Sequence, residues 1–337
     1  MVLGAGGYLG SALCRYFHHL PGHRVLAVFR REPSHLLFDQ SLTADAFADD
    51  WAATIPSDMP VILINCAFDF AAVGEASHAA KYATFERNLA ALCAKAPTRL
   101  INISSMSAHA GCRTDYGTEK MLVEALFARH GGISVRPGLI ASWRWPGAAF
   151  LNLITITKAS RIVPILWARG SGFHFCDLEA VVLGIHRVAD MRLNKPHVAS
   201  FCYHDRLRLG AIVTTIAHRN GLSRLKVPVP WWIAYLLLRV KEKLIGKSKV
   251  RADSIVDFAY SNPKAERRGF FARLVGSHRA ALEAISQTDT DAGFYHLEPH
   301  RRAAATPLAA DVAGRLRGLP DAERVRHHGE RVVAAGN

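Results

Sequence analysis

Tyr116 and Lys120 have the types and the spacing needed for proton-transfer chemistry. They lie four positions apart in Tyr116-Gly-Thr-Glu-Lys120, which continues with the apolar periodicity of a helix. Positions i and i+4 share one face of a helix, so the phenol and the ammonium can converge on one site. A nearby ammonium favours phenolate and lowers a tyrosine pKa from about 10 toward neutrality. Such a pair is also common on ordinary surfaces, so by itself it assigns no activity.

A serine cluster follows the strand predicted at residues 99–103, in Ser104-Ser105-Met106-Ser107. A hydroxyl at a strand end next to the tyrosine could hydrogen-bond the substrate oxygen that is oxidised or reduced. Ser104, Ser105 and Ser107 are the candidates for this role.

The first ten residues contain a candidate phosphate-binding turn. Gly4, Gly7 and Gly10 are spaced by three, with Gly6 as a fourth glycine, between strand-forming residues and a helix predicted at 11–20. A strand that turns tightly into a helix without Cβ atoms lets a pyrophosphate approach the helix N-terminus. Glycine-rich turns also occur for ordinary reasons. Because a strand usually has about 5 to 6 residues and little precedes Gly4, we expect the true start to lie upstream.

Two cations follow the predicted second strand, residues 23–30. A dinucleotide site places an acidic residue about 20 positions after the turn to hold the ribose hydroxyl of NAD. Arg30 and Arg31 stand there instead, and they favour the 2′-phosphate of NADP, which a carboxylate would repel. A solvated basic loop and NAD as cofactor are the alternatives.

The elements that must position these residues alternate along the chain. Strands are predicted at 23–30, 61–67 and 99–103, and helices at 11–20, at 86–95 and from 116 onward. Residues 39–51 are expected to hold a short strand end and a surface helix with solvent-facing acidic residues. Strands alternating with helices are typical of an α/β fold with a parallel sheet.

Composition limits the classes of function. The chain has 337 residues, a formal net charge of +14 and six scattered cysteines without a Cys-x-x-Cys pair. The cysteine pattern suits a reducing compartment, and no signal peptide or spanning segment is visible, so we expect a soluble, cytoplasmic protein. The charge suggests anionic partners, but no nucleic-acid-binding motif accompanies it. The two His-His pairs lack further ligands at metal spacing, and we assign no metal.

Together these motifs resemble the extended branch of the short-chain dehydrogenase/reductase superfamily, the NAD(P)-dependent epimerase/dehydratase family, from Val2 to about Phe271. The ordered matches are the glycine turn, Asn65-Cys66-Ala67, Asn88-Leu89, Ser104-Ser105, Tyr116/Lys120, Val135-Arg136-Pro137-Gly138, Phe173 to Leu178 and Ser261 to Phe270. So many motifs in the expected order are more specific than any one of them.

The resemblance implies a role for each matched residue. Tyr116 would be the general acid/base, Lys120 would hold the nicotinamide ribose and tune the tyrosine, and Ser105 would orient the substrate oxygen. The implied contacts to NADP, or to NAD as the alternative, are Gly4, Gly6, Gly7, Tyr8, Leu9, Gly10, Arg30, Arg31, Cys66, Ala67, Asn88, Tyr116, Lys120, Pro137 and Gly138.

The family fold is a Rossmann-type doubly wound parallel sheet with a smaller, interleaved C-terminal substrate domain. We accordingly expect residues 1–140 to form the Rossmann domain, with 172–202 returning to it, and 141–171 and 203–287 to form the substrate-binding part. Residues 288–337, poor in large apolar residues, are expected to be a loosely held extension.

The expected function is an NAD(P)-dependent oxidoreductase acting on an anionic carbonyl or alcohol substrate, with a nucleotide-linked sugar as the substrate class. The loop before Tyr116 is shorter than in nucleotide-sugar epimerases, and the Arg-Pro-Gly segment lacks their substrate-binding asparagine. Epimerase or dehydratase chemistry with a tightly held cofactor is the first alternative, and a non-catalytic NADP-binding protein is the second. Arg144 is a candidate contact for an anionic substrate, but an ordinary loop cation is the better interpretation. A homodimer is a further possibility that the sequence does not decide.

A segment in the second half of the chain combines tryptophans, an apolar run and cations. It runs from Val227 to Arg251 and includes Trp231 and Trp232. Trp and Leu followed by Lys could lie on an anionic membrane surface. We favour the alternative, a substrate-domain helix that packs its aromatic residues inward and has a solvated basic end.

Overall fold

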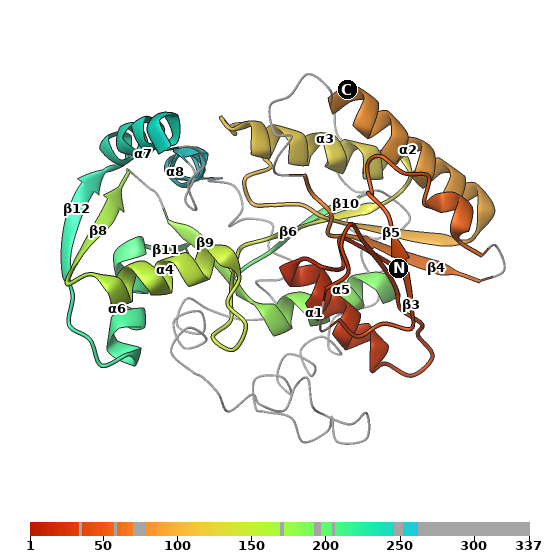
Figure 1. Cartoon of the computed structure of the whole chain (residues 1–337), viewed down its shortest axis with the longest axis horizontal. Helices are drawn as coiled ribbons and strands as arrows, with labels where there is room; N and C mark the ends of the chain where they lie inside the picture. The colour runs from red at the N-terminus through yellow and green to blue at the C-terminus, as the bar shows by residue number, and fades with distance from the viewer. Residues whose placement is uncertain are drawn as a thin grey trace, which may run out of the picture.

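The computed structural model describes residues 1–33, 36–56, 59–69, 78–168, 172–191, 197–203, 206–245 and 252–261. A parallel seven-stranded sheet in the order β10-β6-β5-β4-β1-β2-β3 organises the larger lobe (Figure 1). The order reverses between β1 and β4, which is the topological switch point at which doubly wound sheets bind their ligands. The predicted Rossmann-type α/β fold is confirmed.

The large sheet is built from β1 (Val2–Leu3), β2 (Leu26–Phe29), β3 (Gln40–Thr43), β4 (Val61–Asn65), β5 (Thr98–Ile103), β6 (Ile133–Pro137) and β10 (His197–Phe201). Its helices are α1 (Tyr8–His18), α2 (His78–Lys95), α3 (Asp115–Arg129) and α5 (Leu178–Asp190), with the short η1 (Ala52–Thr54) after β3. Figure 1 shows α2 and α3 on one face of the sheet and α1 and α5 on the other.

Alternate residues of each strand face opposite helical layers. Val2 and Ile64 belong to the core under α1 and α5, whereas Leu3 and Leu63 belong to the core under α2 and α3. All four side chains are buried. A two-sided parallel sheet needs apolar residues at both alternating positions, which is why its strands have apolar runs rather than a polar alternation.

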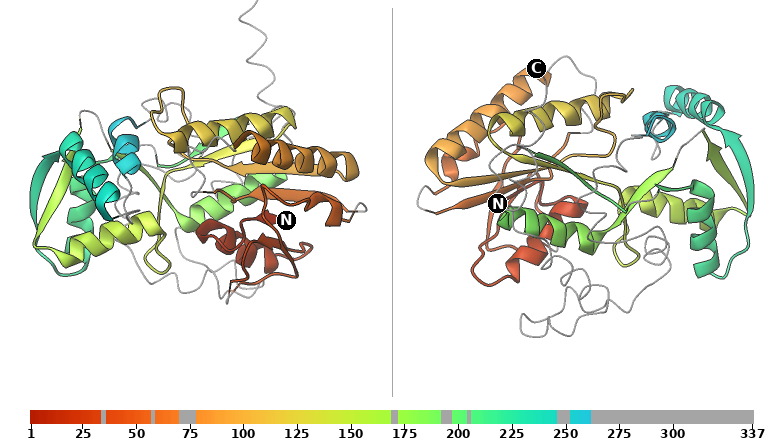
Figure 2. Two further views of the ribbon diagram at one scale, coloured as in Figure 1. Left: turned by 45° about the horizontal axis from the view of Figure 1, so that its top comes forward. Right: turned by 180° about the vertical axis from the view of Figure 1, so that it is seen from behind.

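In the described part of the chain, the smaller lobe contains short sheets and four helices. Strands β7 (Leu139–Ala141), β9 (Phe173–Asp177) and β11 (Arg206–Leu207) form one sheet, and β8 (Ile162–Trp167) pairs in parallel with β12 (Leu225–Pro230). The helices are α4 (Ala148–Ala159), α6 (Leu209–Arg219), α7 (Trp231–Ile245) and α8 (Ala252–Ala259). Figure 2 shows from two further directions that β8, β12 and α7 lie at the end of the molecule away from the large sheet.

Two expectations from the sequence are wrong. No surface helix forms in residues 39–51, where β3 is followed by turns and by η1 at 52–54. Helix α7 does not turn its aromatic residues inward as a group, because Trp232 is 57% exposed. Apolar content shows that a side chain can be buried, but only the neighbouring elements decide whether it is.

Some expectations fall outside the described residues, namely the segment from Asn262 to Phe270 and the extension at 288–337. Within the described residues, no helix is long and apolar enough to cross a membrane.

Candidate active site

The glycine turn has the backbone geometry that its spacing predicts. Gly4 has φ +71°, and a Cβ added there would lie 2.7 Å from the Ala67 nitrogen at the end of β4. A Cβ on Gly10 would lie 2.3 Å from the Gly4 carbonyl oxygen. The first residue therefore makes the tight turn and the last lets helix α1 approach it.

The N-terminus of α1 suits a pyrophosphate group. Gly7 is its N-cap and makes no side-chain capping hydrogen bond, and no acidic residue lies in the first turn. The first N–H groups of a helix lack intrahelical acceptors, and the helix dipole favours an anion there. The turn and the helix end thus fit the pyrophosphate of a dinucleotide.

Lys120 lies buried beneath the carboxyl ends of the strands. Its Nζ donates to the Ile103 carbonyl oxygen at 3.0 Å, at the end of β5. Burial lowers its pKa from 10.5 to about 8, against opposing effects of Cys66 and Glu124. An ammonium has three donors, so the contact with Ile103 leaves others for ribose hydroxyls.

Tyr116 lies one turn before Lys120 and is hydrogen-bonded to Ser105, the predicted partner. Burial raises the tyrosine pKa from 10.0 to about 12, against the lowering effect of the Ser105 hydrogen bond. The sequence argument predicted that the lysine would lower this pKa. In the described structure burial outweighs any such effect, because a phenolate is costly in a poorly solvated position. The tyrosine is therefore a neutral phenol at pH 7.

Phe68 is part of this group although no sequence pattern pointed to it. Its ring lies 5.0 Å from the Tyr116 ring in an edge arrangement, and the Lys120 Nζ lies 4.4 Å from its centroid. A cation over an aromatic face is stabilised without water. Phe68 follows β4 as an isolated aromatic residue, and only the fold brings it to α3.

Ser104 is not available for a substrate. Its hydroxyl donates to Oε1 of Glu124 at 2.5 Å, and Arg136 binds the same carboxylate through two hydrogen bonds of 2.7 and 2.6 Å. Glu124 lies on the α3 face of Tyr116 and Lys120, four residues further on. This ion pair fastens α3 to β6, and it uses the arginine of the predicted Arg-Pro-Gly segment.

Ser107 is also hydrogen-bonded within the protein, to a carboxylate from the smaller lobe. Asp257 on α8 accepts from the Ser107 hydroxyl at 3.1 Å and from the Thr114 hydroxyl at 2.6 Å. Thr114 is the N-cap of α3, and its oxygen accepts from the Gly117 nitrogen at 3.2 Å. Asp257 thereby ties the start of the Tyr116 helix to α8. A single aspartate far along the chain carried no sequence signal for this role.

A buried polar row supports the strand ends. Asn65 donates to Asn102 at 3.0 Å, and Asn102 donates to Ser134 at 3.2 Å, across β4, β5 and β6. Asn65 also accepts from the Ala67 nitrogen at 3.1 Å, which fixes the backbone of the predicted Asn65-Cys66-Ala67 motif where it meets Gly4. Buried amides that satisfy one another hold a strand edge rigidly.

Asn88, a predicted cofactor contact, forms hydrogen bonds within the protein. Its Oδ1 accepts from the Ala52 nitrogen at 3.0 Å, and its Nδ2 donates to the carbonyls of Asp49 and Thr84 at 2.9 and 3.2 Å. The side chain is buried. These hydrogen bonds join α2 to the segment after β3.

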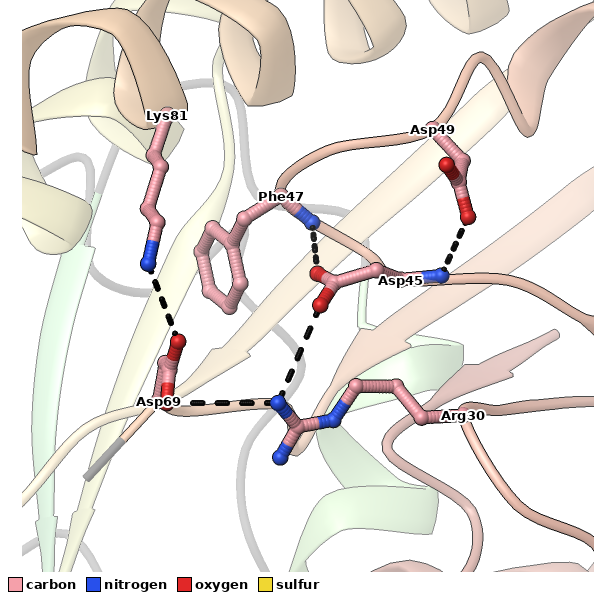
Figure 3. A network of polar contacts seen from close by, with 6 residues as sticks. All are labelled: Arg30, Asp45, Phe47, Asp49, Asp69 and Lys81. Atoms are coloured by element: carbon pink, nitrogen blue, oxygen red, sulfur yellow. Dashed lines mark hydrogen bonds and ion pairs between the residues drawn. The ribbon is translucent and has the colours of Figure 1, made fainter. Parts of the chain in front are cut away.

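Arg30 stands at the end of β2, where the sequence predicts a cofactor phosphate contact. Its Nη1 lies 3.8 Å from Asp45 and 3.9 Å from Asp69, and Lys81 lies 3.1 Å from Asp69 (Figure 3). The arginine side chain is 61% exposed, and such long, exposed ion pairs are weak. Asp45, expected merely to face solvent, thus takes part in the charge network at this strand end.

The remaining predicted contacts lie around these groups. A Cβ on Gly138 would lie 2.5 Å from the His174 carbonyl oxygen, so β6 and β9 approach closely just after Pro137. Burial raises the pKa of the Cys66 thiol. Tyr8, in the first turn of α1, packs against Gly147. Arg31 is exposed.

Arg144 is held against an aromatic ring. Its guanidinium carbon lies 4.4 Å from the Trp145 ring centroid. Within the described residues, no group of three or more His, Cys, Asp and Glu side chains could hold a metal ion.

Comparison with known families supports the resemblance inferred from the motifs. Residues 1–129 match the NAD dependent epimerase/dehydratase family. This stretch contains the glycine turn, Ser105, Tyr116 and Lys120, so the resemblance is confirmed over the part of the chain that carries the proposed chemistry. No curated protein matches the chain significantly.

Solved structures share the fold over most of the chain. MoeE5 in complex with UDP-glucuronic acid and NAD has a TM-score of 0.56 at 17% identity, covering 79% of this chain and 94% of that one. UDP-glucuronic acid 4-epimerase from Bacillus cereus in complex with UDP-glucuronic acid and NAD has a TM-score of 0.53 at 14% identity, covering 77% and 96%. TunA, an NAD-dependent NDP-hexosamine 5,6-dehydratase of tunicamycin biosynthesis, has a TM-score of 0.53 at 13% identity, covering 77% and 95%. At these identities the likeness establishes the fold alone.

Proposed function

We propose that this protein is an NAD(P)-dependent oxidoreductase of the extended short-chain type that acts on a nucleotide-linked sugar. One observation carries the proposal: Ser105, Tyr116 and Lys120 converge at the carboxyl end of β5, in the same lobe as a glycine turn that fits a pyrophosphate. A proton-transfer group, a hydroxyl to orient an oxygen and an ammonium for the ribose are what carbonyl reduction or alcohol oxidation needs.

The residues divide the work by their chemistry. Tyr116 is a neutral phenol at pH 7, since its pKa is raised to about 12, and it can donate its proton to a substrate carbonyl oxygen. Ser105 holds that oxygen and the phenol in line. Lys120 supplies donors for the ribose of the cofactor. The nicotinamide, when bound, supplies or accepts the hydride.

The substrate class rests on the family match and on the similar folds. The family that matches residues 1–129 is named for epimerases and dehydratases, and MoeE5 and the Bacillus cereus epimerase were solved with UDP-glucuronic acid. The net charge of +14 suits an anionic diphosphate substrate. A nucleotide-linked sugar combines that charge with the carbonyl or alcohol group that the site can transform.

NADP is the cofactor that we propose, through Arg30 and Arg31. Arg30 lies at the end of the strand that follows the glycine turn and helix, and its ion pairs with Asp45 and Asp69 are long and exposed. Neither carboxylate is within hydrogen-bond distance of Arg30, so the guanidinium can still donate the paired hydrogen bonds that a 2′-phosphate accepts. The similar structures bind NAD, so NAD is the alternative cofactor.

The alternative reaction is epimerisation or dehydration with a cofactor that is oxidised and restored in one cycle. It needs the same three residues and a dinucleotide retained between turnovers. A non-catalytic dinucleotide-binding protein is the alternative from another class. It would need the glycine turn but neither the Tyr116 hydroxyl nor Ser105.

Native mass spectrometry and one substitution separate these functions. We expect NADP to bind the purified protein, and turnover of a panel of nucleotide-linked sugars to fall by about 10²- to 10⁴-fold in Tyr116→Phe. Tyr16→Phe is the matched control, because Tyr16 hydrogen-bonds His186 on the opposite helical layer. Retained NAD with turnover that consumes no added cofactor would identify the epimerase or dehydratase. Unchanged turnover in Tyr116→Phe would exclude the proposed chemistry.

A further inference from the structure

Helix α7 presents an apolar stripe to its surroundings. Trp232, Leu236, Val240 and Leu244 are spaced by four and are 57%, 58%, 49% and 77% exposed. Side chains at that spacing line one side of a helix, and the adjacent Leu237 is 65% exposed. An exposed stripe of this length on a folded protein marks an interaction site more often than chance exposure.

The opposite side of α7 packs against the rest of the smaller lobe. Trp231 lies 5.6 Å from the Tyr260 ring in an edge arrangement, and the helix packs against α8, β12 and β8. Glu242 accepts from the Ala252 nitrogen at 2.8 Å, at the start of α8. The helix thus uses one side for the fold and leaves the other to a partner.

The two strands that α7 contacts, β8 and β12, expose apolar residues as well. Ile162 of β8 pairs with Leu225 of β12, and they are 54% and 63% exposed. The next residue on β8, Val163, is buried in the core under α6, so the alternation places Ile162 on the outer face. Trp167 at the end of β8 is 64% exposed. The stripe on α7 together with Leu237 is called the α7 surface, and it lies in the smaller lobe (Figure 1).

Cations accompany the α7 surface. Arg239, Lys241 and Lys243 are exposed on α7, where Glu242 is the one acidic residue. Two copies meeting through this surface would bring like charges together, whereas an anionic surface would complement them.

We propose that the α7 surface binds an anionic lipid bilayer. Leucines and a tryptophan on one side of a helix, with lysine and arginine beside them, are the composition of helices that lie in the membrane interface. Tryptophan prefers that interface because its ring is apolar and its N–H is polar. The apolar side chains enter the boundary between headgroups and acyl chains, and the cations contact lipid phosphates. The binding is peripheral and is independent of the proposed reaction.

Co-sedimentation of the full chain with vesicles tests this inference. We expect it to sediment with equal parts phosphatidylglycerol and phosphatidylcholine, to stay in solution with phosphatidylcholine alone, and to be released by salt. The double variant Trp232→Ser/Leu236→Ser should weaken binding by at least about tenfold, since both side chains leave water on binding. The double variant Lys241→Gln/Lys243→Gln should bind anionic vesicles more weakly, and its binding should depend less on the salt concentration.

Leu122→Ser is the matched control, because Leu122 is 49% exposed but lies on α3. It should bind vesicles like the unaltered protein. Circular dichroism of each variant checks that the fold is kept, as expected for exposed positions. Failure to sediment with anionic vesicles would overturn the proposal. So would equal binding by the Trp232/Leu236 variant, or light scattering that shows a dimer which this variant dissociates, since the surface would then pair copies of the chain.

Discussion

The helices α2 and α7 contain similar apolar residues but use them in opposite ways. Leu89 on α2 is 0% exposed, packed between the helix and the large sheet, whereas Leu236 on α7 is 58% exposed. The larger lobe has a seven-stranded sheet wide enough for α2 and α3 to cover together. The smaller lobe offers α7 a two-stranded sheet and α8.

This difference shows that an apolar helix is buried only as far as its neighbours extend. In the larger lobe, burial also reaches charged groups such as Lys120 and Glu124, and it sets their chemistry. On α7 the cations remain exposed and are available to a partner. Under our two proposals, the larger lobe performs the proton transfer and the smaller lobe attaches the protein to a membrane.

The largest expected effect compares two arginines. Arg136 is 18% exposed and binds the buried Glu124 through two hydrogen bonds, whereas Arg239 is 57% exposed and 3.9 Å from Glu242. Arg136→Ala should lower the free energy of unfolding by about 3 to 5 kcal/mol, because it leaves a buried carboxylate unpaired. Arg239→Ala should cost less than about 1 kcal/mol. Urea unfolding measures both, and equal losses would contradict the contrast between the lobes.

A second pair of variants compares the same change at buried and exposed leucines. Leu89→Ala should lower the free energy of unfolding by about 2 to 5 kcal/mol through lost burial and the cavity left behind. Leu236→Ala should change it by less than about 0.5 kcal/mol, as at other exposed positions. A large loss in Leu236→Ala would mean that α7 is covered within the protein itself, and would count against the α7 surface.

Lys120 gives a pH-dependent test of buried charge. Its pKa is lowered from 10.5 to about 8, so between these values the unfolded chain binds the proton that the folded protein lacks. Stability contributed by this group therefore rises with pH through that window and is lowest below it. We expect Lys120→Met to gain stability relative to the unaltered protein at pH 7.5, and this advantage to shrink by about 1 to 3 kcal/mol by pH 10.

Urea unfolding at several pH values measures this difference. Lys241→Met is the control, because Lys241 is exposed on α7. If the stability advantage of Lys120→Met stayed constant from pH 7.5 to 10, burial would not lower the pKa of Lys120.

The smallest expected effect concerns cofactor choice. Arg30→Ser should reduce the ratio of kcat/KM with NADP to kcat/KM with NAD by about tenfold, because it removes a cation from the 2′-phosphate. Arg24→Ser is the control, since Arg24 is exposed just before β2, away from its carboxyl end. Steady-state kinetics measures the ratio, and an unchanged ratio in Arg30→Ser would assign that arginine to its ion pairs with Asp45 and Asp69.

Local pattern predicted much of the larger lobe. The glycine spacing predicted a tight turn from strand to helix, and the Tyr116 to Lys120 spacing predicted one helical face. Hydrophobic periodicity and residue spacing are enough to predict these features, because the features depend on backbone geometry within one or two turns. The pKa of Tyr116 was predicted in the wrong direction, because desolvation depends on the whole surrounding structure and not on the nearest charge.

Residues brought from distant segments could not be predicted. Phe68 reaches Lys120 across 52 positions of sequence, and Asp257 reaches Thr114 across 143. Asn88 matched a motif, yet its amide bonds the backbone near Ala52. A motif identifies a residue type at a position, whereas the hydrogen-bond partner is fixed by how the elements pack.

The sequence by itself therefore determined the alternation of strands and helices, the glycine turn and the pairing of Tyr116 with Lys120. Each follows from periodicity and from the conformations that glycine allows. The tertiary structure decided which of three serines meets the tyrosine, which ionisable groups lose water, and that the apolar stripe of α7 stays uncovered. These outcomes depend on solvent exclusion between segments far apart in the chain, which no local pattern records.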